Sequence, residues 1–236
     1  MKYLKDENFY VDADSAEDTG EPTIVLENRV SDLQQQLVAT PADRDPRGRA
    51  DLLLELAHAL LRLEKNAEAW APAREAFDLF IAASAWEGAI QACDVMFAAD
   101  QPESLAALGQ GVWLSVSFPV DPELTVAMLE HIIEDTPDDS QGAAVAAVVA
   151  HYVVDMRAAE GKQRENLLFY TNRLLATVAR RLGNVQDQQT FDQWFQRLEL
   201  DDPAKFLPRL RNVVDVLVQE SWWLDRAVLQ ARMAVN

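Results

Sequence analysis

Three consecutive stretches from residue 49 onward have the length and apolar spacing of helices, and they strongly favour an all-helical fold. They read RADLLLELAHALLRLEKN, AEAWAPAREAFDLFIAAS and AWEGAIQACDVMFAAD. Apolar residues recur in each at the three- and four-residue spacing of an amphipathic helix. Only short turns separate the stretches, so neighbouring helices are expected to run antiparallel. No strand pattern is found elsewhere, and we predict an all-α antiparallel array, α-solenoid-like, of about nine or ten helices.

Three further helices are informative. A helix from Ile24 to about Val38, capped by Thr23, carries an apolar stripe that is expected to pack on the main domain rather than form a coiled coil. The helix from Gln141 to Glu160 is apolar on every side, so other helices should surround it. Near the C-terminal end, Pro208 is expected to start a helix rather than lie inside one.

These patterns divide the chain into three parts. Residues 1–22 are predicted to be an acidic flexible tail. Residues 23–48 are read as an amphipathic helix and a linker. Residues 49–236 form the all-helical domain, with hairpins over 49–99 and a helical bundle over 102–236.

The stretch from Ala50 to Ala76 is similar to one tetratricopeptide repeat (TPR). Ala57, Ala69 and Ala76 fall on positions where the family has small packing residues. Leu56 and Leu60 fall on positions where it has large apolar residues, and Glu68-Ala69 matches the start of the family's second helix. Glu64 and Ile81 depart from the pattern, where a turn glycine and a proline are usual. The similarity recurs 20 residues later at Trp86-Glu87-Gly88-Ala89, which indicates stacked hairpins rather than a 34-residue tandem array. The resemblance implies a helical-hairpin scaffold that binds other proteins, and it assigns no binding residue.

The net charge constrains the partners. The formal charge of −18 repels nucleic acid phosphates and anionic lipid, so neither nucleic acid nor a membrane is expected as a partner. The single cysteine, Cys93, is expected to be a buried core thiol and fits a reducing cytoplasm. No cofactor is predicted.

The charge is unevenly distributed along the chain. The 82 residues between Arg74 and Arg157 contain no Lys or Arg and 14 acids. These acids are Glu75, Asp78, Glu87, Asp94, Asp100, Glu103, Asp121, Glu123, Glu130, Glu134, Asp135, Asp138, Asp139 and Asp155. Two explanations are open, namely electrostatic steering of a basic partner and a general acidic bias that serves solubility. Nine basic residues against six acids between Lys162 and Arg211 suggest that this region binds the acidic half, in the same chain or in a homodimer.

A metal-dependent helical enzyme is the alternative to a binding protein. Its ligands would be Glu130, His131 and Glu134 on one helix and His151 and Asp155 on another, since these spacings put each set on one helical face. Against it, the Glu-x-x-His order of helical di-metal sites is absent. Asp135, Asp138 and Asp139 resemble an aspartate-rich magnesium motif, but Pro137 breaks the helix, and helix capping explains these acids better.

We therefore predict a non-catalytic scaffold, an adaptor or an assembly chaperone, whose acidic surface meets a basic segment of a protein partner. A less favoured alternative is a nucleic-acid mimic. Tryptophans are common at the centres of protein interfaces, and an adjacent pair should point in different directions on a helix. The predicted binding residues are Trp86, Trp113, Trp222, Trp223, Glu130, Glu134, Asp135, Asp138 and Asp139.

Overall fold

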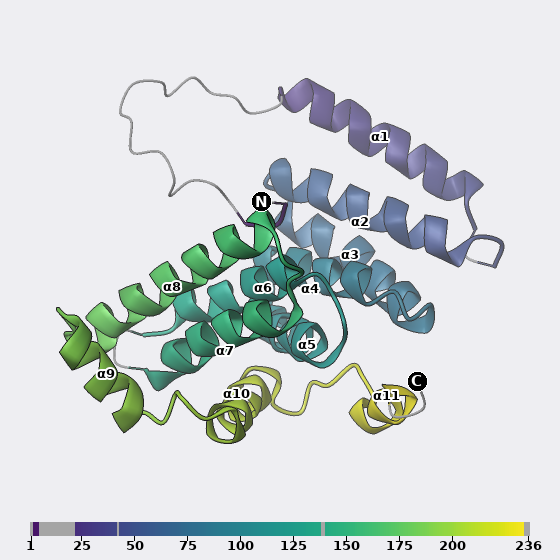
Figure 1. Cartoon of the computed structure of the whole chain (residues 1–236). Helices are drawn as coiled ribbons and strands as arrows, with labels where there is room; N and C mark the ends of the chain where they lie inside the picture. The colour runs from purple at the N-terminus through teal and green to yellow at the C-terminus, as the bar shows by residue number, and fades with distance from the viewer. Residues whose placement is uncertain (1, 5–21, 42, 138–139, 234–236) are drawn as a thin grey trace. The chain divides into compact units, whose positions relative to one another are not determined.

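The computed structural model of the chain describes residues 2–4, 22–41, 43–137 and 140–233. These residues form eleven α-helices and no strand, which confirms the predicted all-α array (Figure 1). The helices are α1 (Thr23–Ala39), α2 (Pro46–Arg62), α3 (Asn66–Ala82), α4 (Trp86–Ala98), α5 (Ser104–Ser117), α6 (Pro122–Asp135), α7 (Gln141–Arg157), α8 (Lys162–Gly183), α9 (Gln188–Arg197), α10 (Pro203–Val218) and α11 (Arg226–Met233). Most of the predicted acidic tail, and Asp138 and Asp139, lie outside the described residues.

The chain divides into two compact units. The hairpin unit comprises Glu21–Leu114 and Val214–Asn236, and the central unit comprises Met1–Gly20 and Ser115–Val213. Each unit therefore combines segments that are far apart in the sequence, and both α5 and α10 contribute residues to both units.

Helices α2, α3 and α4 of the hairpin unit repeat with a step of 20 residues. Helix α2 ends at Arg62 and α3 ends at Ala82, while α3 begins at Asn66 and α4 begins at Trp86. Helix α3 packs against both neighbours, and α4 also contacts α2. The turns are three residues long, so each helix reverses the direction of the one before it.

The first two turns have the same backbone geometry. Glu64 and Ser84 both take a left-handed conformation, with φ of 57° and 54°. The next amide donates back into the helix each time, from Lys65 to the carbonyl of Leu60 and from Ala85 to that of Phe80, both at 2.9 Å. This is the Schellman ending of a helix, at a position where glycine is preferred because it has no Cβ.

Replacing Glu64 by glycine is expected to raise the free energy of unfolding by about 1 kcal/mol, because it removes the left-handed strain of a residue with a Cβ. Urea denaturation measures the gain. Glu64→Ala is the matched control, since it removes the same carboxylate and keeps the Cβ. An equal gain in both variants would show that charge, not backbone strain, is responsible.

Helix α1 packs along α2 through its apolar stripe, as predicted. Leu26, Val30 and Leu33 are buried, and the last two join a cluster with Leu56 and Leu60 of α2. The prediction that Thr23 caps α1 is wrong, because Thr23 is the first helical residue and the residue before it, a proline, makes no side-chain cap.

Helix α2 starts inside the predicted linker. The Asp45 carboxylate accepts the backbone N–H of Gly48 at 2.8 Å, and Pro46 occupies the first helical position. An aspartate cap followed by proline is a strong helix start, and it places the beginning of α2 three residues before Arg49.

The central unit is built on α7. Its alanines and valines between Ala143 and Val154 are buried almost without interruption, and α7 packs against both α6 and α8. The prediction of a helix surrounded by others is confirmed. Helix α7 begins where the Ser140 hydroxyl accepts the N–H of Gly142 at 3.2 Å, and it ends at Arg157, before the expected Glu160.

The prediction that a helix starts at Pro208 is wrong. Helix α10 starts at Pro203, where the Asp202 carboxylate accepts the N–H of Ala204 at 2.9 Å, and it continues through Pro208. Phe206 packs the part of α10 between the two prolines into the core. Its side chain is 2% exposed, and its ring meets that of Tyr152 edge-on at 5.6 Å. Tertiary packing therefore offsets the hydrogen bond that proline cannot donate.

Candidate functional site

Trp223 lies in a cluster of aromatic rings inside the hairpin unit. Its ring meets Trp70 edge-on at 6.2 Å and Phe77 at 5.6 Å, and the Arg74 guanidinium lies 4.4 Å from its centroid. Its backbone N–H donates to the buried side-chain oxygen of Gln110 at 2.9 Å. The segment after α10 is thereby fixed to α3 and α5, and much of the Trp223 surface serves the unit's own packing.

Trp222, which like Trp223 lies between α10 and α11 and not on a helix, makes a second aromatic contact. Its ring meets Trp113 of α5 edge-on at 6.1 Å, and the Arg226 guanidinium lies 3.9 Å from its centroid. Arg226 also pairs with Asp215 at 2.9 Å. Like these two tryptophans, Trp86 at the start of α4 is half-buried. The predicted tryptophans thus offer a partner only part of their surface.

Glu130 of α6 and Tyr170 of α8 are joined by a hydrogen bond from the phenol to the carboxylate. Burial raises the pKa of Glu130, and the negative charge of Glu134 raises it further. The hydrogen bond from Tyr170 and the nearby His131 lower it, but the net effect is a raised pKa. Burial and the same hydrogen bond raise the pKa of Tyr170 above its ordinary value. The pair joins α6 to α8 through a carboxyl group whose pKa lies above its ordinary value.

This contact predicts a pH dependence of stability. Because the pKa of Glu130 is raised, the folded protein binds more protons than the unfolded chain from about the ordinary pKa of 4.5 upward. The free energy of unfolding is therefore expected to fall as pH rises from that value through the raised pKa. Glu130→Gln should remove this decrease, and urea denaturation between pH 4 and pH 8 measures it.

The matched control is Glu165→Gln on α8, since Glu165 is exposed. That variant should keep the wild-type pH dependence. If Glu130→Gln changes stability by the same amount at every pH, the change reports altered packing and the titration of Glu130 is not responsible.

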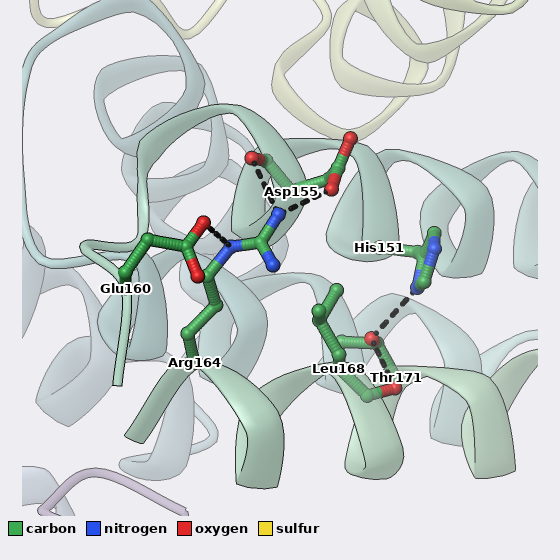
Figure 2. Close-up of polar contacts among 6 residues, drawn as sticks. All are labelled: His151, Asp155, Glu160, Arg164, Leu168 and Thr171. Carbon is green, nitrogen blue, oxygen red and sulfur yellow. Dashed lines mark hydrogen bonds and ion pairs between the residues drawn. The ribbon is translucent and has the colours of Figure 1, made fainter. Parts of the chain in front are cut away.

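His151 and Asp155 of α7 each have a partner on α8 (Figure 2). The Nδ1 of His151 lies 3.1 Å from the Thr171 hydroxyl, and burial lowers the pKa of the histidine. The Asp155 carboxylate pairs with Arg164 at 2.6 Å, and Arg164 also lies 3.7 Å from Glu160. These contacts join the two helices, and Asp155 is engaged by a cation.

The metal-site alternative lacks a ligand cluster in the part of the chain that the structure describes. No group of three or more His, Cys, Asp and Glu side chains lies together there. Instead, Glu130 accepts from Tyr170 and Asp155 pairs with Arg164. Cys93 is fully buried and burial raises its thiol pKa, which confirms that it is a core thiol.

Several acids of the cation-free stretch are exposed. In the hairpin unit, Asp100 and Glu103 lie in the connection between α4 and α5. In the central unit, Glu134 and Asp135 lie at the end of α6. We call these four residues the exposed acidic set. Three acids nearer the ends of the stretch are paired: Glu75 with Arg49 at 2.7 Å, Asp78 with Arg74, and Asp155 with Arg164.

Two buried polar residues, Gln110 and Glu123, and the half-buried Arg157 hold the helices, and the sequence analysis assigned this role to none of them. The Glu123 carboxylate accepts the backbone N–H groups of Tyr3 and Leu4, and the Gln110 side chain accepts that of Trp223. The Arg157 guanidinium binds the carbonyls that end α5. The available signal was the position of Gln110 in a largely apolar helix, where a polar side chain needs a partner.

Comparison with known proteins gave no match to a family model, a curated protein or a solved structure. Among the described residues, no helix has both the length and the apolar character that a bilayer crossing requires.

Proposed function

We propose that this protein is a non-catalytic protein-binding scaffold, an adaptor or an assembly chaperone, that receives a basic segment of a protein partner on its acidic surface. The observation that carries the proposal is the exposure of Asp100 and Glu103 on the hairpin unit and, separately, of Glu134 and Asp135 on the central unit, in a stretch of 82 residues without one Lys or Arg. Exposed acids attract the opposite charge over about a Debye length and speed encounter with a basic partner.

A TPR-like hairpin array supports the scaffold part of the proposal. Ala57, Ala69 and Ala76, which fall on the small packing positions of the TPR family, are all 0% exposed. The first turn places Glu64 in the left-handed conformation that suits the usual glycine. Stacked hairpins of this kind present extended surfaces on which proteins bind.

The apolar part of the contact is assigned to the accessible surface of Trp86, next to Glu87 at the start of α4. A half-buried tryptophan offers a rigid apolar surface at small entropic cost. The single cysteine, Cys93, suits a protein of the reducing cytoplasm.

Affinity purification from the source cell at low salt, followed by salt washes, tests the proposal. We expect a defined basic partner whose retention falls between about 50 and 300 mM salt, since screening shortens the range of the attraction. Asp100→Asn with Glu103→Gln should weaken retention. The matched control replaces Arg44 and Arg62, both of the hairpin unit, by glutamine, and it should retain the partner. Recovery of no partner, or equal retention in all variants, would contradict the proposal.

A further inference from the structure

Two residues close to the start of the sequence are bound to a buried carboxylate of the central unit. One oxygen of Glu123 accepts the backbone N–H of Tyr3 at 2.7 Å and that of Leu4 at 3.3 Å. Glu123 is 1% exposed, and the Leu4 side chain is 5% exposed. A short segment of chain is therefore bound to α6 through its backbone, and one of its apolar side chains is buried.

The position of Glu123 explains how a carboxylate is tolerated there. It is the second residue of α6, and its own backbone N–H is taken by the Asp121 side chain at 2.9 Å. The amino end of a helix favours negative charge, and consecutive backbone N–H groups that converge on one oxygen form an anion-binding arrangement. The carboxylate thus depends on a peptide segment to supply its donors.

The bound segment, Lys2-Tyr3-Leu4, shows which chemical groups a ligand of the Glu123 site presents. The backbone amides of Tyr3 and Leu4 bind Glu123, and the Leu4 side chain is buried. Tyr3 is half-buried, and the exposed Lys2 amino group lies 4.6 Å from the centre of its ring. A ligand that resembles the bound segment therefore offers two consecutive backbone N–H groups, the second from a leucine and the first from an aromatic residue that follows a basic one.

We infer that the Glu123 site is a peptide-binding site, filled within one chain by Lys2-Tyr3-Leu4 and able to take the same segment from a second copy of this chain. The segment of a second copy fits because it is chemically identical to the one already bound. Exchange of segments between copies then links two chains without any new contact surface. The inference does not depend on the proposed function, since Glu123 is buried and is not one of the exposed acids.

Fluorescence anisotropy with a labelled peptide of residues 1–8 tests the site on the full chain. Leu4→Asp should open the site, and the peptide is expected to bind this variant at least about tenfold more tightly than it binds wild type, where the chain's own segment competes at high effective concentration. Adding Glu123→Gln should weaken binding by about tenfold, because charge-assisted hydrogen bonds are lost. A peptide carrying Leu4→Asp is the control ligand.

Co-purification of a tagged with an untagged wild-type chain tests the second copy. Mixed pairs are expected, and Leu4→Asp in both copies should abolish them, while absence of mixed pairs overturns the exchange.

If Leu4→Asp fails to fold, hydrogen exchange of wild type replaces it. The Tyr3 and Leu4 amides should be protected, and excess peptide should remove the protection. Unprotected amides, or equal peptide binding with Glu123→Gln, overturn the peptide-binding site.

Discussion

Trp223→Ala is expected to lower the free energy of unfolding of the hairpin unit by about 3 kcal/mol, near the low end for aromatic truncation because the ring is half-buried. The change removes the edge contacts with Trp70 and Phe77 and the nearer of the two rings that the Arg74 guanidinium faces. Urea denaturation measures the loss, and near-ultraviolet circular dichroism should show a weaker aromatic signal.

Two controls distinguish aromatic packing from a general effect of truncation. Trp223→Phe keeps a ring in the cluster and should cost about 1 kcal/mol. Phe169→Ala removes an aromatic side chain that is 55% exposed, and it should change stability by less than about 0.5 kcal/mol. A loss of similar size in Trp223→Ala and Phe169→Ala would contradict a packing role for Trp223.

Arg157→Ala is expected to destabilise the central unit by about 3 kcal/mol, since hydrogen bonds from a charged group contribute more than neutral ones and their acceptors would be left unsatisfied. The guanidinium donates to the carbonyls of Ser115 at 2.8 Å and Phe118 at 3.1 Å, and also to that of Val116. These groups end α5, where a cation is further favoured by the helix dipole.

Arg157→Lys is the matched control because it keeps the charge and loses the fork of donors. About half of the stability is expected to return, since an ammonium group cannot reach three carbonyls in the geometry of a guanidinium. Thermal and urea denaturation of both variants measure the difference. Full recovery in the lysine variant would show that charge alone stabilises the end of α5.

The local patterns of the sequence were sufficient for most of the helices. The alanines and valines of α7 predicted a surrounded helix, which the structure confirms. The same reasoning failed at Pro208, because α10 continues past this proline and is stabilised there by the burial of Phe206. It succeeded where a signal lies within a few residues and failed where a distant contact decided the outcome.

The candidate site was less predictable than the fold. Spacing placed His151 and Asp155 on one face of α7, but it gave no account of Thr171 and Arg164, which engage them from α8 (Figure 2). It found the acidic stretch, because charge is a property of composition. Which of its acids stay exposed and which, like Glu123, are buried depends on packing.

The sequence by itself determined the helical class, the 20-residue step of the hairpins and the one-signed charge, because periodicity, caps and composition are local properties. Only the tertiary structure decided which distant residues are in contact. Trp223 packs on α3 and is hydrogen-bonded to α5, Arg157 binds carbonyls at the end of α5, and Glu123 accepts the N–H groups of Tyr3 and Leu4. Each of these contacts joins residues about 40 to 150 positions apart. Pairing across such distances is selected by burial and by the need of each buried polar group for a partner, which no local pattern encodes.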